Sequence, residues 1–271
     1  MSIARNITWA LAIGFSMGSA FAASTTGSFV SGTGTLDFMN NEFRTQGLLG
    51  ISTTYQLPDG NPLPVNAVQY NRPTRLATLT FDSGAISATD GKVSFSAGNA
   101  QLSLVTARAQ EDEYGNPYDD LPPRINLVTF RNITFDLSDV SIRADITSYT
   151  GTANGLQLVD SFGKITVFKG IAPIIDGTQG LVVDGQASGS TVGGLRLTDE
   201  GADIVLNGLY AWDGELLDKD LPYSIYAFGK ASSWGTASAF GTFTSSVPET
   251  STQWMMFTGL LALFAFSRRS H

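Results

Sequence analysis

An alternation of apolar and polar residues with a period of two recurs between residues 24 and 244, and it constrains the fold more than any other feature. In "RLATLTFD", for example, Ala77, Leu79 and Phe81 would share one face of an extended chain. Such alternation over about four to eight residues, rich in Thr, Val, Ile and Phe, is typical of half-buried antiparallel strands. The same pattern occurs in KVSFSA (92–97), AQLSLVTA (100–107), RNITFDL (131–137), DVSIRADI (139–146), KITVFKG (164–170), PYSIYAFGKA (222–231) and WGTASAFGTFTS (234–245).

Clusters of Gly, Pro, Asn and Asp separate these segments, and each can supply the backbone angles of a tight turn. They include PDGNP (58–62), TDGK (89–92), SYTGTANG (148–155) and IDGTQG (175–180). Many short strands joined by such turns predict a mainly β fold, an antiparallel β-sandwich or a barrel-like pair of sheets. We expect residues 24–244 to form a single domain.

One segment, residues 196–212, has helical rather than strand periodicity. Its sequence RLTDEGADIVLNGLYAW offers Thr198 or Asp199 as an N-cap. Apolar residues then recur at helical spacing, which predicts a short helix over residues 199–207 with Gly208 as its stop. We expect this helix to cover one end or one open edge of the sheets.

The charge and the missing residue types exclude several kinds of chemistry. The chain has a formal net charge of −8, which would repel phosphate backbones, so we expect no nucleic-acid partner. It has no cysteine, and its only histidine is the last residue, His271. Ser-His-Asp and Cys-His catalysis and zinc sites built on Cys or His are therefore excluded.

An acidic loop, AQEDEYGNPYDDLPPR (109–124), is the one candidate metal site. Its carboxylates could supply the oxygen ligands that calcium prefers. The spacing does not follow the D-x-D-x-D-G pattern, and a solvated loop is the other interpretation. The five candidate ligands are Glu111, Asp112, Glu113, Asp119 and Asp120. We expect no other cofactor.

Two further alternatives concern carbohydrate. A pair of carboxylates could make a secreted glycoside hydrolase or lyase, but the sequence singles out no pair, so we expect the chain not to be an enzyme. Alternatively, aromatic residues could form a sugar-stacking platform, or they could simply pack in the core. These aromatic residues are Tyr210, Trp212, Tyr223, Tyr226 and Trp234.

The N-terminus has the order of features found in secretory signal peptides. Arg5 is followed by the apolar stretch ITWALAIGFSM and then by small residues at Ala20, Ala22 and Ala23. A positive charge, a short apolar core and an A-x-A-like site predict a signal peptide over residues 1–23. The chain would then leave the cytoplasm through the Sec export machinery.

The C-terminus combines a polar linker, an apolar run and two arginines. Residues 245–253 form the linker, and residues 254–266 are an apolar run of 13 residues. This run is shorter than the roughly 20 residues that cross a bilayer comfortably. Arg268 and Arg269 follow it and would stay on the cytoplasmic side of the inner membrane. Residues 254–271 therefore predict a hydrophobic helix with a basic end.

The tail VPETSTQWMMFTGLLALFAFSRR resembles the PEP-CTERM sorting signal of Gram-negative bacteria. Val247, Pro248 and Glu249 match its motif, and Thr250 replaces the usual second proline. The resemblance covers about the last 25 residues and implies nothing about the fold of the rest.

The resemblance implies recognition by an exosortase, which would cleave or transfer the chain near the motif. It further implies a transient membrane anchor and a final place on the cell surface or in the exopolysaccharide of a biofilm matrix, in a structural or adhesive role. The same tail also carries an ice-binding label, but no regular Thr-x-Thr array is evident in the body.

Overall fold

The chain folds mainly into antiparallel β-structure, as its alternation predicts. The computed structural model describes residues 27–42, 50–52, 68–87, 91–110, 114, 116–171, 182, 185–191, 193–210 and 223–244. In these residues the strands are β1 (Phe29–Asp37), β2 (Gly50–Ser52), β3 (Val68–Asn71), β4 (Leu76–Thr80), β5 (Ser83–Ile86), β6 (Val93–Arg108), β7 (Arg124–Asp136), β8 (Ser141–Thr152), β9 (Gly155–Gly170), β10 (Gln186–Ser190), β11 (Leu195–Leu197) and β12 (Thr236–Phe243). The helices are α2 (Asp199–Tyr210) and α3 (Tyr223–Ala231).

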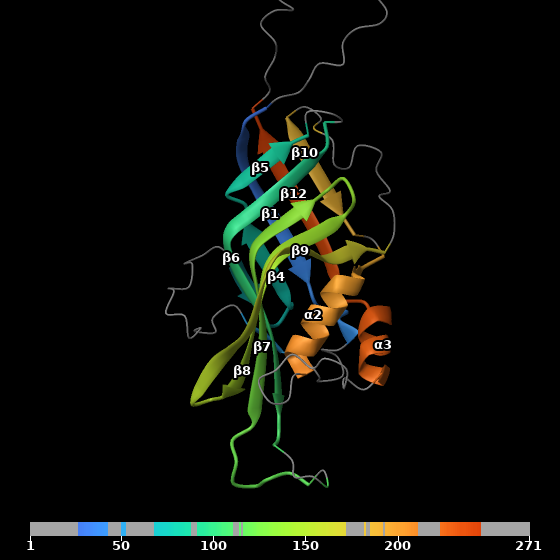
Figure 1. The fold of residues 1–271 in the computed structure, drawn as a ribbon. Helices are drawn as coiled ribbons and strands as arrows, with labels where there is room; N and C mark the ends of the chain where they lie inside the picture. The colour runs from blue at the N-terminus through green and yellow to red at the C-terminus, as the bar shows by residue number, and fades with distance from the viewer. Residues whose placement is uncertain are drawn as a thin grey trace, which may run out of the picture. The chain divides into compact units, whose positions relative to one another are not determined.

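The strands form two curled antiparallel sheets that together make a half-barrel. The five-stranded sheet has the order β10-β12-β1-β4-β3, and the seven-stranded sheet has the order β11-β9-β8-β7-β6-β2, with β5 also pairing with β6. In Figure 1 the long strands β6 and β9 cross in front of β1 and β12.

Bulges explain why the seven-stranded sheet curls. Three residues of β9, namely Val159, Gly163 and Val167, have no opposite residue on β8. A bulge on β7 includes Asn132, whose φ of 50° lies in the left-handed region. Each extra residue bends its strand and increases the local twist, so the repeated bulges bend the whole sheet.

Phenylalanine rings fill the space between the sheets. Phe81 and Phe95 stack with their ring centroids 5.0 Å apart, and Phe135 meets Phe81 edge-on. The facing strands carry small residues, so the rings lie close to their backbones. A Cβ atom at Gly241 on β12 would lie only 2.2 Å from Phe95 Cε1. Aromatic burial against glycine and alanine therefore joins the two sheets.

Helix α2 begins at the expected N-cap but ends later than expected. Thr198 Oγ1 accepts a hydrogen bond from the Gly201 amide over 2.9 Å and donates one to the Thr166 carbonyl over 2.6 Å. The helix continues through Gly208 to Tyr210, so the predicted stop at Gly208 is wrong.

Gly208 serves close packing instead of ending the helix. A Cβ atom there would lie 2.5 Å from Ser148 Oγ and 2.6 Å from Val128 Cγ2. Helix α2 therefore packs on strands within the seven-stranded sheet, including β7 and β9, and not only at an end or edge.

Residues 223–231 form helix α3, although the alternation in PYSIYAFGKA predicts a strand. Two contacts to α2 explain the difference. The Tyr226 hydroxyl donates to Asp203, and Lys230 Nζ lies 2.5 Å from Asp199 Oδ1. The fully buried Trp234 also donates from Nε1 to the Gly229 carbonyl over 2.9 Å. The alternation in this segment is short and is compatible with a strand or with a helix. The tertiary contacts therefore stabilise the helix.

Among the described residues, no helix is long and apolar enough to cross a membrane. The predicted signal peptide (1–23), linker (245–253) and hydrophobic tail (254–271) lie outside these residues. The same holds for their key positions, which are Ala20, Ala22, Ala23, Val247, Pro248, Glu249, Thr250, Arg268 and Arg269.

Candidate functional site

The outer side of the five-stranded sheet carries rows of small uncharged polar side chains, which we call the hydroxyl face. Its outward position follows from the burial of the alternate residues, such as Leu36, Leu79 and Ala239. The hydroxyl face consists of Gln186, Ser188 and Ser190 on β10, Thr236, Ser238, Phe240 and Thr242 on β12, Ser31, Thr33, Thr35 and Asp37 on β1, Leu76, Thr78 and Thr80 on β4, and Gln69 and Asn71 on β3.

Strand register aligns these side chains across the sheet. The longest row runs through all five strands and contains Ser190, Ser238, Thr35, Thr78 and Gln69. Within it, Thr35 Oγ1 and Ser238 Oγ are 2.6 Å apart and share a hydrogen bond. Directly opposed hydroxyl pairs of this kind stabilise an antiparallel sheet and fix the positions of their oxygens.

Two Thr-x-Thr pairs become neighbours in this face. Thr33 and Thr35 on β1 lie opposite Thr80 and Thr78 on β4. Strand pairing thus brings two Thr-x-Thr pairs from distant segments side by side, although they do not extend into a regular array. The arrangement is limited to two strands, since Phe240 and Ser238 occupy the corresponding positions on β12.

The hydroxyl face carries one ionisable side chain among its described residues, Asp37. The outer side of the seven-stranded sheet differs, because it carries Arg131, Arg143, Asp145 and Lys164. Soluble proteins ordinarily mix both signs of charge over their surfaces. The hydroxyl face, with Asp37 as its single ionisable side chain among the described residues, is therefore unusual on a chain with a net charge of −8.

Phe240 is the one aromatic side chain of the hydroxyl face. It lies between Thr33 on β1 and Ser188 on β10, and 44% of it is exposed. An exposed ring surrounded by hydroxyls offers an apolar surface beside hydrogen-bonding groups. The sequence places Phe240 at an outward position of TASAFGTF, which is the signal that could have identified it.

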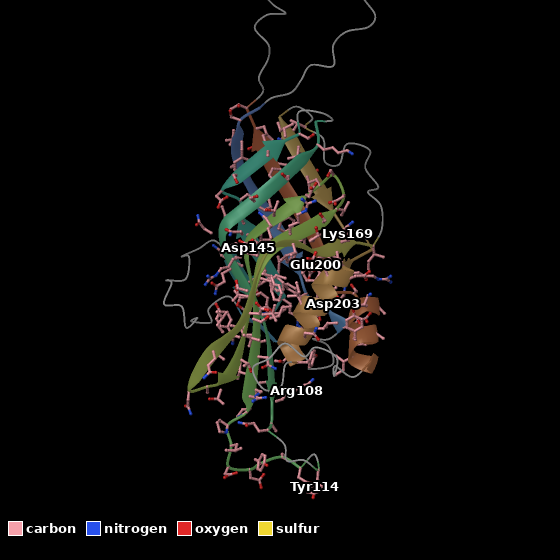
Figure 2. The ribbon with its side chains drawn as sticks, in the orientation of Figure 1. Arg108, Tyr114, Asp145, Lys169, Glu200 and Asp203 are labelled. Atoms are coloured by element: carbon pink, nitrogen blue, oxygen red, sulfur yellow. The ribbon has the colours of Figure 1, made fainter. Side chains whose placement is uncertain are left out.

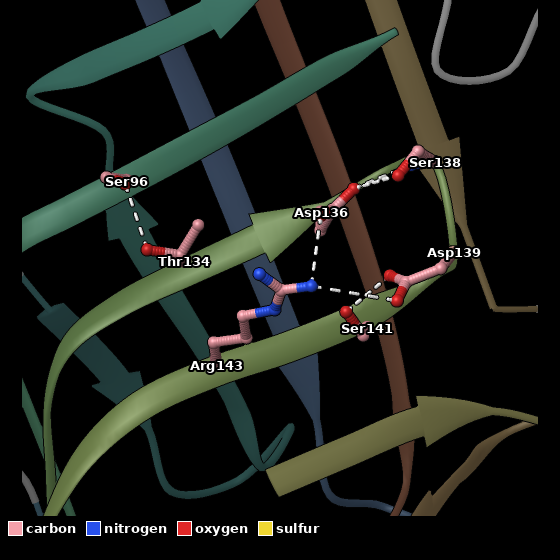
Figure 3. Close-up of polar contacts among 7 residues, drawn as sticks. All are labelled: Ser96, Thr134, Asp136, Ser138, Asp139, Ser141 and Arg143. Carbon is pink, nitrogen blue, oxygen red and sulfur yellow. Dashed lines mark hydrogen bonds and ion pairs between the residues drawn. The ribbon is translucent and has the colours of Figure 1, made fainter. Parts of the chain in front are cut away.

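A second polar cluster closes the turn between β7 and β8 (Figure 3). Arg143 Nη2 lies 3.6 Å from Asp136 Oδ2 and 3.8 Å from Asp139 Oδ2. Asp136 also accepts a hydrogen bond from the Ser138 amide over 2.9 Å, and Asp139 accepts one from the Ser141 hydroxyl. One guanidinium thus holds both carboxylates, which is an arrangement for fixing a turn.

This cluster does not present two carboxylates to a cleft, as hydrolysis of a glycosidic bond requires. Among the described residues, the adjoining cleft of about 240 Å³ has Asp136 as its one acidic lining residue, the others being Ala85, Ile86, Ser87, Lys92, Val93, Ser94 and Ser138. A further cleft of about 280 Å³ is lined, in the part of the chain that the structure describes, by Gln110, Arg124, Thr150, Gly151, Thr152, Gly155 and Gln157, none of which is acidic.

Only part of the predicted calcium loop can be placed. Asp119 and Asp120 are exposed, whereas Glu111, Asp112 and Glu113 lie outside the described residues. Tyr114 lies at the far end of this loop (Figure 2). Within the part of the chain that the structure describes, no group of three or more His, Cys, Asp or Glu side chains could hold a metal ion. Calcium binding stays a prediction.

The predicted aromatic platform is not assembled from the residues that can be placed. Tyr210 and Trp234 are buried, and Tyr226 packs between the helices. Burial raises the pKa of Tyr210, an effect that the Arg108 guanidinium, 4.2 Å from the ring centroid, opposes. Trp212 and the side chain of Tyr223 lie outside the described residues.

Comparisons of the chain with protein-family models, with curated proteins and with solved structures found no match.

Proposed function

We propose that the chain is an exported, non-catalytic protein of the cell surface or biofilm matrix whose hydroxyl face binds a neutral polysaccharide. The observation that carries this proposal is an aligned polar face on an acidic chain, in which Asp37 is the one ionisable side chain among the described residues. Each hydroxyl can donate and accept hydrogen bonds, as can each hydroxyl of a sugar. A polymer of sugars is therefore a chemically matched occupant.

The lack of positively charged side chains among the described residues of this face favours a neutral over an acidic polysaccharide. An acidic polymer would meet no Lys or Arg side chain among the described residues of the hydroxyl face. It would also approach a chain of net charge −8, so long-range electrostatics would oppose the encounter. A neutral sugar avoids this repulsion, and the ring of Phe240 would stack on its apolar face.

Sorting in this proposal follows from the two ends of the chain. Residues 1–23 direct export as a signal helix, and an exosortase recognises Val247, Pro248, Glu249 and Thr250. The hydrophobic helix of residues 254–271 anchors the chain until processing, with Arg268 and Arg269 on the cytoplasmic side. The two curled sheets would act as a β-sandwich whose outer face is presented to the matrix.

Binding is tested by affinity electrophoresis of the full chain in gels that contain hydroxyethyl cellulose or polygalacturonate. We expect the neutral glucan to retard migration and the polyuronate to leave it unchanged. Phe240→Ala should weaken binding of the glucan by about 0.5–1.5 kcal/mol, roughly a two- to tenfold loss. Thr33→Glu, which places a charge beside that ring, should weaken it as well.

The matched control is Leu158→Ala, because Leu158 is also an exposed apolar residue, 60% exposed on β9 in the other sheet. It should bind the glucan as the wild type does. If Phe240→Ala and Leu158→Ala behave alike, or if the polyuronate binds as well as the glucan, the hydroxyl face is not the binding surface.

Sorting has a separate test in an exosortase-containing host. Deletion of residues 247–271 should release the chain into the medium, and replacement of Val247, Pro248 and Glu249 by alanine should leave it unprocessed in the membrane. Immunoblots of membrane, envelope and medium fractions measure both outcomes. Unchanged envelope retention of the deletion variant would contradict the sorting proposal without affecting the binding test.

A further inference from the structure

The turn between β8 and β9 contains one of the two Asn-Gly pairs in the sequence, Asn154-Gly155. The other pair, Asn207-Gly208, lies within helix α2. An asparagine followed by glycine loses its side-chain amide more readily than other asparagines do. The reason is that glycine has no side chain to keep its backbone nitrogen away from the asparagine side-chain carbonyl. The two pairs have opposite surroundings, and we expect these to decide where the reaction occurs.

The pair in the turn is exposed and unrestrained. Ala153, Asn154 and Gly155 are all exposed, and the pairing of Thr152 with Gly155 closes a two-residue turn. The Asn154 backbone amide donates to Thr152 Oγ1 over 3.3 Å, but the side chain of Asn154 has no hydrogen-bond partner among the described residues. Its carbonyl carbon can therefore turn toward the Gly155 nitrogen without breaking a side-chain contact.

The pair in the helix is protected. Asn207 is half-buried and Gly208 is buried. Inside an α-helix the Gly208 nitrogen donates to the carbonyl four residues earlier. The tight contact of Gly208 with Ser148 and Val128 leaves no room for the backbone to rotate. The reaction here requires the helix to leave the sheet, which costs far more free energy than opening the last turn of a hairpin.

We propose that Asn154 is a site of spontaneous deamidation in the folded protein. The Gly155 nitrogen gives up its proton to the solvent and attacks Cγ of Asn154. The N–Cγ bond forms, the Cγ–Nδ2 bond breaks, and ammonia leaves. Water then opens the five-membered imide at one of its two carbonyls. Opening at Cγ gives aspartate with the original backbone, whereas opening at the main-chain carbonyl gives isoaspartate, in which the main chain runs through Cγ.

Both products place a new carboxylate in the turn of a chain whose net charge is already −8. Thr152 and Gly155, which flank the turn, also line the cleft of about 280 Å³. Arg124 is the one charged residue among the described residues that line this cleft. The reaction would therefore add a negative charge at the rim of a cleft that carries a positive one. Isoaspartate also lengthens the backbone of the turn by one atom, so we expect it to weaken the Thr152–Gly155 pair.

The proposal is tested by keeping the full-length chain in mild detergent at mildly alkaline pH, which favours loss of the amide proton. Samples taken over time are digested at mildly acidic pH, where the reaction is slow, and analysed by mass spectrometry. We expect the peptide that contains position 154 to gain one mass unit and to separate into two products. Conversion should be at least about tenfold faster at Asn154 than at Asn207, because the turn opens more easily than the helix.

Two controls separate the structural cause from the sequence. Gly155→Ala keeps Asn154 and should slow its conversion severalfold. The variant should fold normally, because a Cβ atom at Gly155 meets nothing within 4 Å in the described part of the chain and its φ is not left-handed. In urea that unfolds the chain, Asn154 and Asn207 should react at similar rates.

Two outcomes would overturn the proposal. One is conversion at Asn154 in the folded chain that is no faster than conversion at Asn207. The other is a Gly155→Ala chain that reacts as fast as the wild type. Neither measurement involves a polysaccharide or an exosortase, so both outcomes would leave the proposed binding and sorting functions standing.

Discussion

The side-chain amide of Asn126 donates a hydrogen bond to the carbonyl oxygen of Leu209 over 3.0 Å, which ties strand β7 to the last turn of helix α2. The Thr106 hydroxyl donates to the same oxygen over 2.5 Å, and the Thr150 hydroxyl donates to Asn126 Oδ1 over 2.6 Å. The last carbonyls of a helix lack intrahelical partners. Here β6 and β7 supply two donors to the Leu209 carbonyl, and Thr150 on β8 holds the Asn126 side chain in place.

Replacing Asn126 should therefore destabilise the fold. Asn126→Ala removes the bond to Leu209 and leaves the buried Thr150 hydroxyl without its acceptor, so we expect a loss of about 2–3 kcal/mol in the free energy of unfolding. Urea denaturation monitored by circular dichroism measures it. Asn99→Ala, at an exposed side chain, should change the free energy by less than about 0.5 kcal/mol. Equal stability of the two variants would contradict the capping role.

Gly208→Ala separates helix propensity from packing. Propensity alone predicts a gain of about 1 kcal/mol. We expect instead a loss of about 1–3 kcal/mol, because the new methyl group would meet Ser148 and Val128. Gly163→Ala, where a Cβ atom meets nothing within 4 Å, is the control.

A double variant checks the cause of that loss. The Ser148 hydroxyl is buried without a hydrogen-bond partner, so Ser148→Ala alone should be neutral or slightly stabilising. Combined with Gly208→Ala, it should recover part of the lost stability, since Val128 still restricts the space. Thermal unfolding of the four chains gives the coupling, and strict additivity would show that Ser148 is not the obstructing group.

The contact between the two helices should weaken at high pH. The hydrogen bond that the Tyr226 hydroxyl donates to Asp203 raises the pKa of Tyr226, and desolvation adds to this. The folded state thus holds the phenolic proton more tightly than the unfolded state does. This contribution to stability is complete below the ordinary pKa of 10.0 and is lost as pH rises through the raised value.

The Tyr226→Phe variant, which lacks the ionisable hydroxyl, isolates the contribution of the Tyr226 proton to the pH dependence of stability. The difference in urea midpoint between wild type and Tyr226→Phe should be constant at neutral pH and shrink as the pH rises above 10.0. Tyr210 has a raised pKa in both chains, so its contribution cancels in the difference. A difference that does not depend on pH would contradict the role of the Tyr226 proton.

The turn cluster around Arg143 should contribute little to stability. Arg143 and Asp139 are about two-fifths exposed, and water screens their ion pair. Arg143→Met should cost about 1 kcal/mol or less and make unfolding less sensitive to salt. Chemical denaturation at low and high salt measures both. A loss of several kcal/mol would assign the cluster a larger role than turn closure.

Local patterns in the sequence predict much of the fold. The period-two segments correctly place the apolar residues of β4, β7 and β8 in the core, and Thr198 acts as an N-cap. These features depend on neighbours within a few residues along the chain. Helix α3 could not be predicted in this way, because it is stabilised by contacts to Asp199 and Asp203, which belong to helix α2.

The hydroxyl face could not be predicted in the same way. Its longest row joins residues from Thr35 to Ser238, and only strand order and register bring them together. The sequence shows the outward positions of each strand, but it does not show which strands are neighbours. For the same reason Phe240 could be expected to point outward but could not be assigned to a surface with Thr33 and Ser188.

The bulges of β9 have a consequence for the edge that this strand forms beyond its short pairing with β11. Each bulge interrupts the regular spacing of backbone donors and acceptors along the strand. An incoming strand would find no continuous ladder of hydrogen-bonding groups there, so the bulges that curl the sheet also protect this edge against aggregation.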